Sequence, residues 1–200
     1  MARPLSFDRD RVVDDAMRTF WRHGLHATSA DDLCRATGLG RGSLYNTFGG
    51  KDALFAECLA AYLERTRAQG EELLSDSALD VPTRISTLLT RLVAEEVERR
   101  ADDAPLGCLG VNTIAELSND PEHTDLVDMI NEDTATRLRS LTAVLRLGQA
   151  AGEITDQVGA EGLATFVNAA IAGLRISSQR GASRQALVDI VTSTVRALRA

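Results

Sequence analysis

The sequence predicts an all-α fold of about nine helices, and three observations lead to this expectation. Apolar residues recur at spacings of three and four through most of the 200 residues, whereas the period-two alternation typical of strands is nearly absent. Gly and Pro residues separate the periodic segments, as helix ends require. The composition, 44% hydrophobic and 26% charged, is that of an ordinary globular protein and excludes a disordered chain or a small disulfide scaffold.

Residues 1–52 are expected to form an N-terminal domain that opens with a helix between Asp8 and Gly24. The apolar residues of this segment repeat at helical spacing and give one broad face, and Gly24 supplies a left-handed stop. These apolar residues are Val12, Val13, Ala16, Met17, Phe20 and Trp21.

A second, short helix is expected to begin at Ser29. Ser29 followed three residues later by Asp32 resembles a capping box, and Gly38 is a typical helix stop. Leu33 and Ala36 are expected to face inward from this helix.

Residues 53–200 are expected to form a larger helical domain. One helix restarts after a Gly-Gly break, and Pro residues mark three later helix starts, since Pro is favoured near the first turn. The later helices are expected at 83–100, 108–117, 123–151, 160–178 and the C-terminal segment, and the Pro residues are Pro82, Pro105 and Pro121.

The last two helices are expected to form a homodimer interface, because few chain segments remain to cover their apolar residues. Gly162 and Gly173 are among the small residues that would let a partner helix approach closely. The alternative is that both helices pack on the preceding ones. The expected interface residues are Leu163, Phe166, Val167, Ala170, Ile171, Leu174, Leu187, Ile190, Val191, Thr194, Val195 and Leu198.

No metal, no cofactor and no membrane contact is expected. His23 and His26 are separated by a helix stop, and His123 has no histidine near it. The cysteines lack the CxxC spacing of zinc or redox sites, and neither a signal peptide nor an apolar span is present, which favours a reducing, cytoplasmic location. The cysteines are Cys34, Cys58 and Cys108, of which the first two are expected in or near the core.

The formal net charge of −7 argues, as an average, against a nucleic-acid binder. The charge is unevenly distributed, however. Residues 1–52 hold 8 basic and 7 acidic residues (+1), so residues 53–200 hold the other 14 basic and 22 acidic residues (−8). Residues 33–51 contain Arg35, Arg41 and Lys51 and no acidic residue.

Residues 29–48 have the layout of a helix-turn-helix: a helix, a Gly-containing turn and a short polar helix over residues 41–48. Arg and Asn side chains can bridge the major-groove edges of guanine and adenine. Leu33, Ala36, Leu39, Leu44 and Phe48 would hold the two short helices against the first helix. The residues left free to enter a major groove are Arg41, Gly42, Ser43, Tyr45, Asn46 and Thr47.

The segment TSADDLCRATGLGRGSLYNTFGGKDALF, with Phe20 and Gly24 ahead of it, resembles the N-terminal domain of the tetracycline-repressor (TetR/AcrR) family of bacterial transcriptional regulators. The resemblance covers roughly residues 8–55. It implies a homodimer in which the last helices dimerise and a C-terminal domain binds an inducer. It departs from the family at Gly40 and Gly50, where a capping Ser is common. By position, it implies phosphate contacts from Thr28, Ser29, Tyr45, Thr47 and Lys51, and base-facing positions for Arg41, Gly42, Ser43 and Asn46.

Cys108 is expected to open a helix, where a thiol tends toward reactivity. Spacing by four places Cys108, Asn112 and Glu116 on one face of that helix, and this face is a candidate wall of a ligand or redox sensor. Met129 and Asn168 are further candidates for the same cavity. The alternative is a buried structural thiol beside solvated polar residues.

The sequence therefore predicts a ligand-responsive DNA-binding transcriptional regulator, most often a repressor in proteins of this kind. A homodimer would bind a pseudo-palindromic double-stranded operator and be released by an unknown small-molecule inducer or a redox signal. The chain is not expected to be an enzyme. The alternatives are an all-helical enzyme or small-molecule carrier without DNA binding, and an architectural DNA binder without a sensor.

Overall fold

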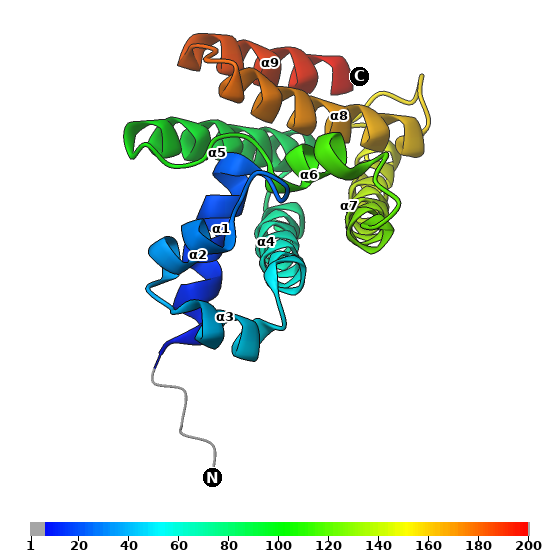
Figure 1. Ribbon diagram of the computed structural model, residues 1–200. Coiled ribbons are helices and arrows are strands. Elements are labelled where there is room, and N and C mark those ends of the chain that lie inside the picture. The colour runs from blue at the N-terminus through cyan, green and yellow to red at the C-terminus, as the bar shows by residue number, and fades with distance from the viewer. Residues whose placement is uncertain (1–6, 200) are drawn as a thin grey trace.

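The computed structural model describes residues 7–199 and confirms the all-α fold (Figure 1). Nine helices lie in this part of the chain, and the one extended pairing there is an isolated bridge between Ile154 and Arg199. The helices are α1 (Arg9–His23), α2 (Ala30–Thr37), α3 (Arg41–Phe48), α4 (Lys51–Leu74), α5 (Val81–Ala101), α6 (Leu109–Leu117), α7 (Thr124–Ala150), α8 (Ala160–Gln179) and α9 (Arg184–Leu198).

Local capping signals set the first helix boundaries as the sequence predicts. The Ser29 hydroxyl accepts a hydrogen bond from the Asp32 amide, and the Asp32 carboxylate accepts one from the Ser29 amide, which confirms the capping box. Gly38 ends α2 in the left-handed conformation with a φ of 72°. Helices α3 and α4 begin directly after Gly40 and Gly50, although neither residue offers a side-chain cap.

Three local expectations are wrong. Ala36 is exposed, because the short helix α2 packs on the core through Leu33 alone, which is its one buried residue. Pro105 and Pro121 do not lie in a first helical turn, since α6 and α7 begin several residues after them. Pro82 does lie in the first turn of α5.

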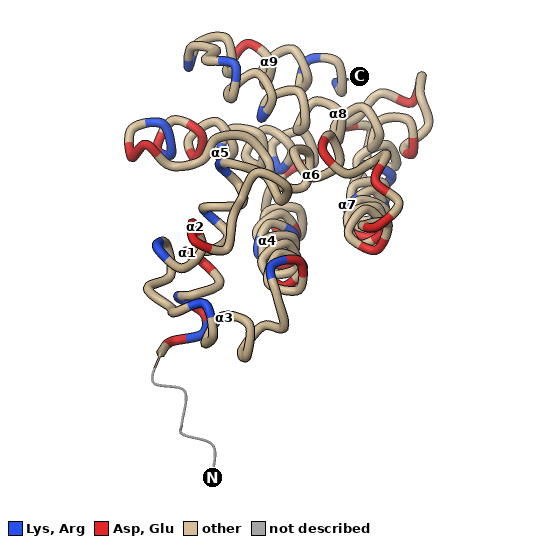
Figure 2. Tube along the Cα trace, in the orientation of Figure 1, with Lys and Arg blue, Asp and Glu red and all other residues tan. Residues whose placement is uncertain are grey.

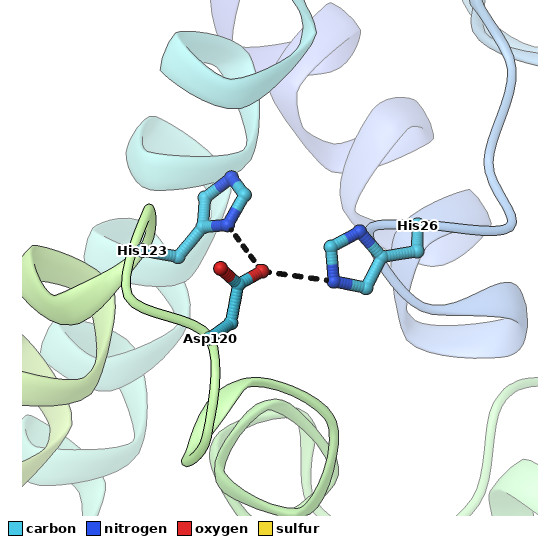
Figure 3. A group of neighbouring side chains, drawn as sticks. All are labelled: His26, Asp120 and His123. Atoms are coloured by element: carbon cyan, nitrogen blue, oxygen red, sulfur yellow. Dashed lines mark hydrogen bonds and ion pairs between the residues drawn. The ribbon is translucent and has the colours of Figure 1, made fainter.

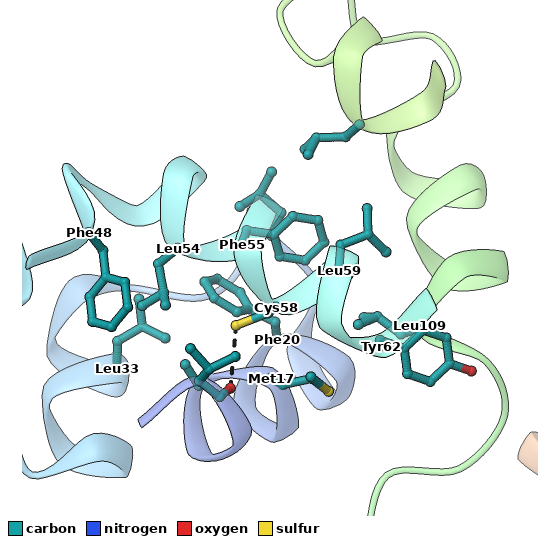
Figure 4. Packing of buried hydrophobic residues seen from close by; sticks show 14 of the residues in the cluster. Met17, Phe20, Leu33, Phe48, Leu54, Phe55, Cys58, Leu59, Tyr62 and Leu109 are labelled. Carbon is teal, nitrogen blue, oxygen red and sulfur yellow. Dashed lines mark hydrogen bonds between the residues drawn. The ribbon is translucent and has the colours of Figure 1, made fainter. Parts of the chain in front are cut away.

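The buried apolar residues form two cores. The first core contains residues from the helices α1, α2, α3, α4 and α6 and from the start of α7. Figure 4 shows Leu33 and Phe48 at one side of this core and Leu109 near Tyr62 at the other. The rings of Phe20 and Phe55 meet edge to face at 4.9 Å in its centre. The second core is built from α5, α7, α8 and α9, with Leu74 from the end of α4 and Ile154 from the α7–α8 loop. Helix α4 packs on α1 in the first core and on α5 and α7, so it connects the two halves of the molecule.

Helix α3 and the last two helices, α8 and α9, lie at opposite ends of the molecule. In Figure 1, α3 lies at one end, beside the start of α1, and α8 and α9 form the opposite end. Helix α6 lies between these ends, packed on both α4 and α7. No helix between residues 7 and 199 combines the length and the apolar character that a membrane crossing needs.

Most of the residues expected at a dimer interface are instead buried within one chain. Because α5 and α7 pack on α8, and α5 also packs on α9, the more apolar stripe of each terminal helix is already covered. Eight of the twelve expected residues are at most 8% exposed in one chain: Leu163, Val167, Ile171, Leu174, Leu187, Val191, Thr194 and Leu198. Phe166 is exposed, and Ala170, Ile190 and Val195 are half-buried.

A second stripe of small and apolar residues faces away from the core, and we call it the outer face of α8 and α9. On both helices it follows alternating spacings of four and three, the period at which one helix packs along another. Phe166 and Ile176 are 43% and 42% exposed on it, a large exposure for apolar side chains. Its residues are Gly162, Phe166, Ala169, Gly173 and Ile176 on α8, and Ala186, Ile190, Ser193 and Ala197 on α9; all are exposed except Ile190, which is half-buried and also packs against the second core.

The turn after α1 requires glycine, which gives a stability prediction. Gly24 has φ 82° and ψ 173°, a region that only glycine adopts readily, and a Cβ atom there would lie 2.6 Å from Glu116 Oε2. We expect Gly24→Ala to lower the free energy of unfolding by about 1–3 kcal/mol in urea denaturation.

Gly38→Asn is the matched control, because Asn tolerates the left-handed conformation of Gly38 and nothing lies within 4 Å of a Cβ atom there. Equal losses in the two variants would contradict a specific requirement at Gly24.

Candidate nucleic-acid interface

Buried leucine and phenylalanine side chains hold the helix-turn-helix against α1 and α4. Leu33 of α2 and Leu44 of α3 are fully buried, and Phe48 is nearly so. The Arg9 guanidinium lies 4.6 Å above the Phe48 ring and also pairs with Glu57 of α4. Helix α3 is therefore fixed by one face and leaves the other face free.

The free face of α3 carries the residues that the sequence singles out. Arg41, Gly42, Ser43 and Asn46 are exposed, Tyr45 is 46% exposed, and Thr47 is half-buried. Arg41 is the one charged residue of α3, so the rest of this helix is uncharged in Figure 2. The face thus offers a guanidinium, hydroxyls and an amide, which are groups that read base edges and bind phosphates.

The remaining expected phosphate contacts lie at two helix starts, in different situations. Ser29 is exposed as the N-cap of α2. Thr28 is 1% exposed, and its hydroxyl donates to the Gly24 carbonyl at 2.6 Å, so its side chain faces inward. Lys51 is half-buried, and its ammonium donates one hydrogen bond to the Leu25 carbonyl at 2.9 Å.

An acidic residue that the sequence analysis did not weigh lies beside this face. Asp31 of α2 forms an exposed ion pair with Arg41, with Oδ1 3.3 Å from the guanidinium. A carboxylate here both competes for Arg41 and repels phosphates. Asp31 lies just outside the acid-free segment 33–51, and it reaches Arg41 across the turn between α2 and α3, so the charge count of that segment did not include it.

The loop between α1 and α2, residues 24–29, fastens the helix-turn-helix to the rest of the molecule, and we call it the junction loop. The Glu116 carboxylate of α6 accepts hydrogen bonds from the Leu25 amide at 3.0 Å and the His26 amide at 2.8 Å. The Leu25 side chain is fully buried. Glu116 is thus a connecting residue and does not line a cavity.

A cavity of about 230 Å³ lies between α4, α5, α6, α7 and α8. Leucine and isoleucine side chains make up much of its wall, and polar groups come from α4, α7, α8 and the N-cap of α6, which is the usual composition of a small-molecule site. The polar or ionisable lining residues include Tyr62, Thr66, Arg67, Cys108, Thr134, Arg137, Ser140, Asn168 and Arg175.

A buried ion pair positions the segment before α6. Arg175 and Glu96 are 5% and 1% exposed, and the guanidinium donates to Glu96 Oε1 at 3.1 Å. Both groups also hold Gly107: its carbonyl accepts from Arg175 at 3.1 Å, and its amide donates to Glu96 at 3.0 Å. The next residue, Cys108, is therefore set at the cavity wall.

Cys108 contacts one further cavity group. The Tyr62 hydroxyl donates to the Cys108 sulfur at 3.2 Å. Burial raises the pKa of Tyr62 far above its ordinary value, so this hydroxyl keeps its proton.

Cys58 lies in the first core, as expected, and burial raises the pKa of its thiol.

The expected sensor face is partly wrong. Cys108 and Asn168 line the cavity, but Asn112 accepts from Gln179 at 2.9 Å, Glu116 binds the junction loop, and Met129 packs against the first core. Cys108 is the N-cap of α6, with extended backbone angles (φ −127°, ψ 121°). Counting in steps of four from Cys108 therefore does not give one helix face.

The structure also brings together two histidines that the sequence analysis treated as unrelated. The rings of His26 and His123 lie 5.6 Å apart between centroids, and Asp120 lies between them. The expectation that His123 has no histidine near it is wrong, because the α6–α7 loop folds back onto the junction loop.

Two family models match the chain. Residues 12–58 match the family described as bacterial regulatory proteins of the tetR family, and residues 83–195 match the tetracyclin repressor-like C-terminal domain. The first match contains the whole helix-turn-helix, and the second covers α6, α7 and α8 and most of α5 and α9.

Individual relatives agree with the family models. The HTH-type transcriptional repressor ComR of Escherichia coli is 34% identical, over 97% of this chain and 90% of ComR. The TetR family transcriptional regulator CifR, in a cysteine-substituted form complexed with 26-base-pair operator DNA, superposes with a TM-score of 0.85 at 31% identity, over 98% of this chain and 100% of CifR. A TetR family regulator from Agrobacterium tumefaciens shares the fold, with a TM-score of 0.83 at 20% identity, over 96% of this chain and 97% of the regulator.

Both halves of the chain match models of one family, and relatives more than 30% identical align along nearly its whole length. The chain therefore belongs to the TetR family of bacterial transcriptional regulators.

Proposed function

We propose that this protein is a homodimeric transcriptional repressor that binds a pseudo-palindromic operator in the bacterial cytoplasm and is released by a small molecule in its cavity. The exposed face of α3 is the observation that carries the DNA-binding part of the proposal. The operator complex of CifR, a relative 31% identical over the same length, supports it. Residues 1–52 would bind DNA, and residues 53–200 would bind the ligand and the second subunit.

Within this face we assign base-reading positions to Arg41, Gly42, Ser43 and Asn46. Tyr45, Thr47 and Ser29 are assigned to phosphates. Lys51 would contact a phosphate with the two ammonium protons that the Leu25 carbonyl leaves free. The buried Thr28 side chain is assigned a structural role, because its hydroxyl caps the turn at Gly24.

Asn46→Ala tests the assigned face, because Asn46 is exposed and its loss leaves the core intact. We expect operator affinity to fall about 5- to 150-fold, the loss typical of one bidentate base contact, in a gel-shift titration at fixed salt with an operator selected from random DNA.

Asp31→Asn provides an opposite-signed control on the neighbouring helix. Removing its carboxylate frees Arg41 and lowers the repulsion of phosphates, so affinity is expected to rise about two- to fivefold. Unchanged binding by Asn46→Ala, with an intact dimer, would contradict the assignment of this face.

We propose that the dimer forms through the outer face of α8 and α9, which keeps Phe166 and Ile190 of the residues expected from the sequence and none of the eight that are buried within one chain. Two copies of this face would bring four helices together, with Phe166 and Ile176 packing across the interface and Gly162 and Gly173 allowing close approach. The 43% and 42% exposures of Phe166 and Ile176 in one chain support this assignment.

Phe166→Asp is expected to convert the dimer to a monomer in size-exclusion chromatography with light scattering, because it places a charge at the centre of the apolar contact. Tyr45→Asp is the matched control: Tyr45 is similarly exposed, at 46%, but belongs to α3, which lies at the opposite end of the molecule from α8. A Phe166→Asp protein that stays dimeric at low micromolar concentration would place the interface elsewhere.

The cavity is proposed to bind the inducer. Its volume of about 230 Å³ suits a small, mainly apolar molecule with one or two polar groups. Cys108 in its wall is proposed to react with electrophilic inducers, forming a bond between its sulfur and an electrophilic carbon. The partial exposure of Cys108 and its place beside Tyr62 support this role.

N-ethylmaleimide tests the role of Cys108, since its double bond accepts the sulfur on one carbon and the thiol proton on the other. Cys34 is also partly exposed, so the experiment uses a Cys34→Ser background. We expect maleimide to release the Cys34→Ser protein from its operator in a gel shift, and the Cys34→Ser/Cys108→Ser protein to stay bound. Equal release of both proteins would exclude Cys108 as the sensor.

A further inference from the structure

Three side chains from two distant loops converge beside the junction loop (Figure 3). Asp120 of the α6–α7 loop lies with Oδ2 3.1 Å from His26 Nε2 and 2.8 Å from His123 Nδ1. Figure 3 shows both imidazole rings turned toward the same carboxylate, with His26 approaching from the junction loop. The one remaining histidine of the chain, His23, is the last residue of α1.

We propose that His26, Asp120 and His123 bind one divalent transition-metal ion of the Zn²⁺ type, with water completing the coordination. One ligand atom from each residue lies within 4.8 Å of the other two. Tetrahedral bonds of about 2.0–2.1 Å place neighbouring ligand atoms about 3.3 Å apart, so small side-chain rotations suffice. Two imidazole nitrogens and one carboxylate oxygen form a donor set that Zn²⁺ accepts in proteins, whereas Ca²⁺ and Mg²⁺ prefer oxygen ligands alone.

The proposed ligands are held by their surroundings. Asp120 Oδ1 accepts the Glu122 amide at 2.9 Å, which turns Oδ2 toward the histidines. The second ring nitrogen of His123, Nε2, lies 4.0 Å from the Asp52 carboxylate at the start of α4. A carboxylate behind a metal-binding histidine is the usual arrangement that orients the ring.

Access to the proposed site is also suitable. The side chains of His123 and Asp120 are 13% and 19% exposed, whereas that of His26 is 54% exposed. Two ligands are thus shielded and nearly fixed, and the third can swing to admit an ion from solvent. In the ring tautomers without a proton on the facing nitrogens, both rings offer lone pairs toward the position of the ion.

A bound ion would connect parts of the chain that have different functions. His26 belongs to the junction loop that precedes α2. Asp120 and His123 follow α6, which contributes three residues to the cavity wall. The ion would therefore reinforce the link that Glu116 already makes, and it would stabilise the position of the helix-turn-helix relative to the cavity helices.

The test is Zn²⁺ binding to the metal-stripped full-length protein, measured by competition with a chromophoric chelator in the presence of a phosphine reductant. We expect one ion per chain and a higher melting temperature with Zn²⁺ than without. His26→Ala and His123→Ala are each expected to weaken binding at least about tenfold, since even the loss of an orienting group costs that much. His23→Ala is the matched control and is expected to bind as the wild type does.

Co²⁺ distinguishes this site from the thiols, because thiolate ligands give an intense near-ultraviolet band that nitrogen and oxygen ligands lack. A wild-type protein that does not bind Zn²⁺ at micromolar concentrations, a His26→Ala protein that binds as tightly as the wild type, or a thiolate band with Co²⁺ would each overturn the proposal. The cluster would then be a hydrogen-bonded His-Asp-His group only. None of these measurements uses DNA, so they are independent of the repressor proposal.

Discussion

The position of the helix-turn-helix relative to α6 depends on the bonding of one residue, Leu25. Its side chain is fully buried in the first core, its amide donates to Glu116 of α6, and its carbonyl accepts from Lys51 at the start of α4. Backbone groups beside a buried side chain must find partners, and here both partners are charged side chains from other helices. One residue therefore fixes α1, α4 and α6 relative to each other.

This connection gives a physical route between the proposed ligand cavity and the proposed operator-binding face. Helix α6 contributes Gly110, Val111 and Ile114 to the cavity, and Glu116 from its last turn to the junction loop. A ligand that displaced the first three residues would also move Glu116, because a nine-residue helix tends to move as one unit. The helix-turn-helix would move with α6, because the junction loop connects it to Glu116.

Sequence reasoning succeeded where the determinant is local and failed where it is a contact between distant segments. The capping box at Ser29 and the stop at Gly38 depend on neighbouring residues, so the limits of α2 were predictable. Periodicity also identified α8 and α9, but each carries two apolar stripes, and sequence alone does not say which one faces the core. The pairing of His26 with His123 and of Leu25 with Glu116 depends on the folding of the α6–α7 segment and has no local signal.

The buried Arg175–Glu96 pair is best understood as a positioning device. Transferring two charges from water into the protein interior is costly, and an apolar pair of the same volume often stabilises a fold as well or better. Here each charge also binds one backbone group of Gly107, whose φ of 80° lets the chain turn directly before Cys108. The pair therefore contributes less to net stability than to the position of the Cys108 thiol at the cavity wall. A fixed position of this thiol is what the proposed sensor role of Cys108 requires.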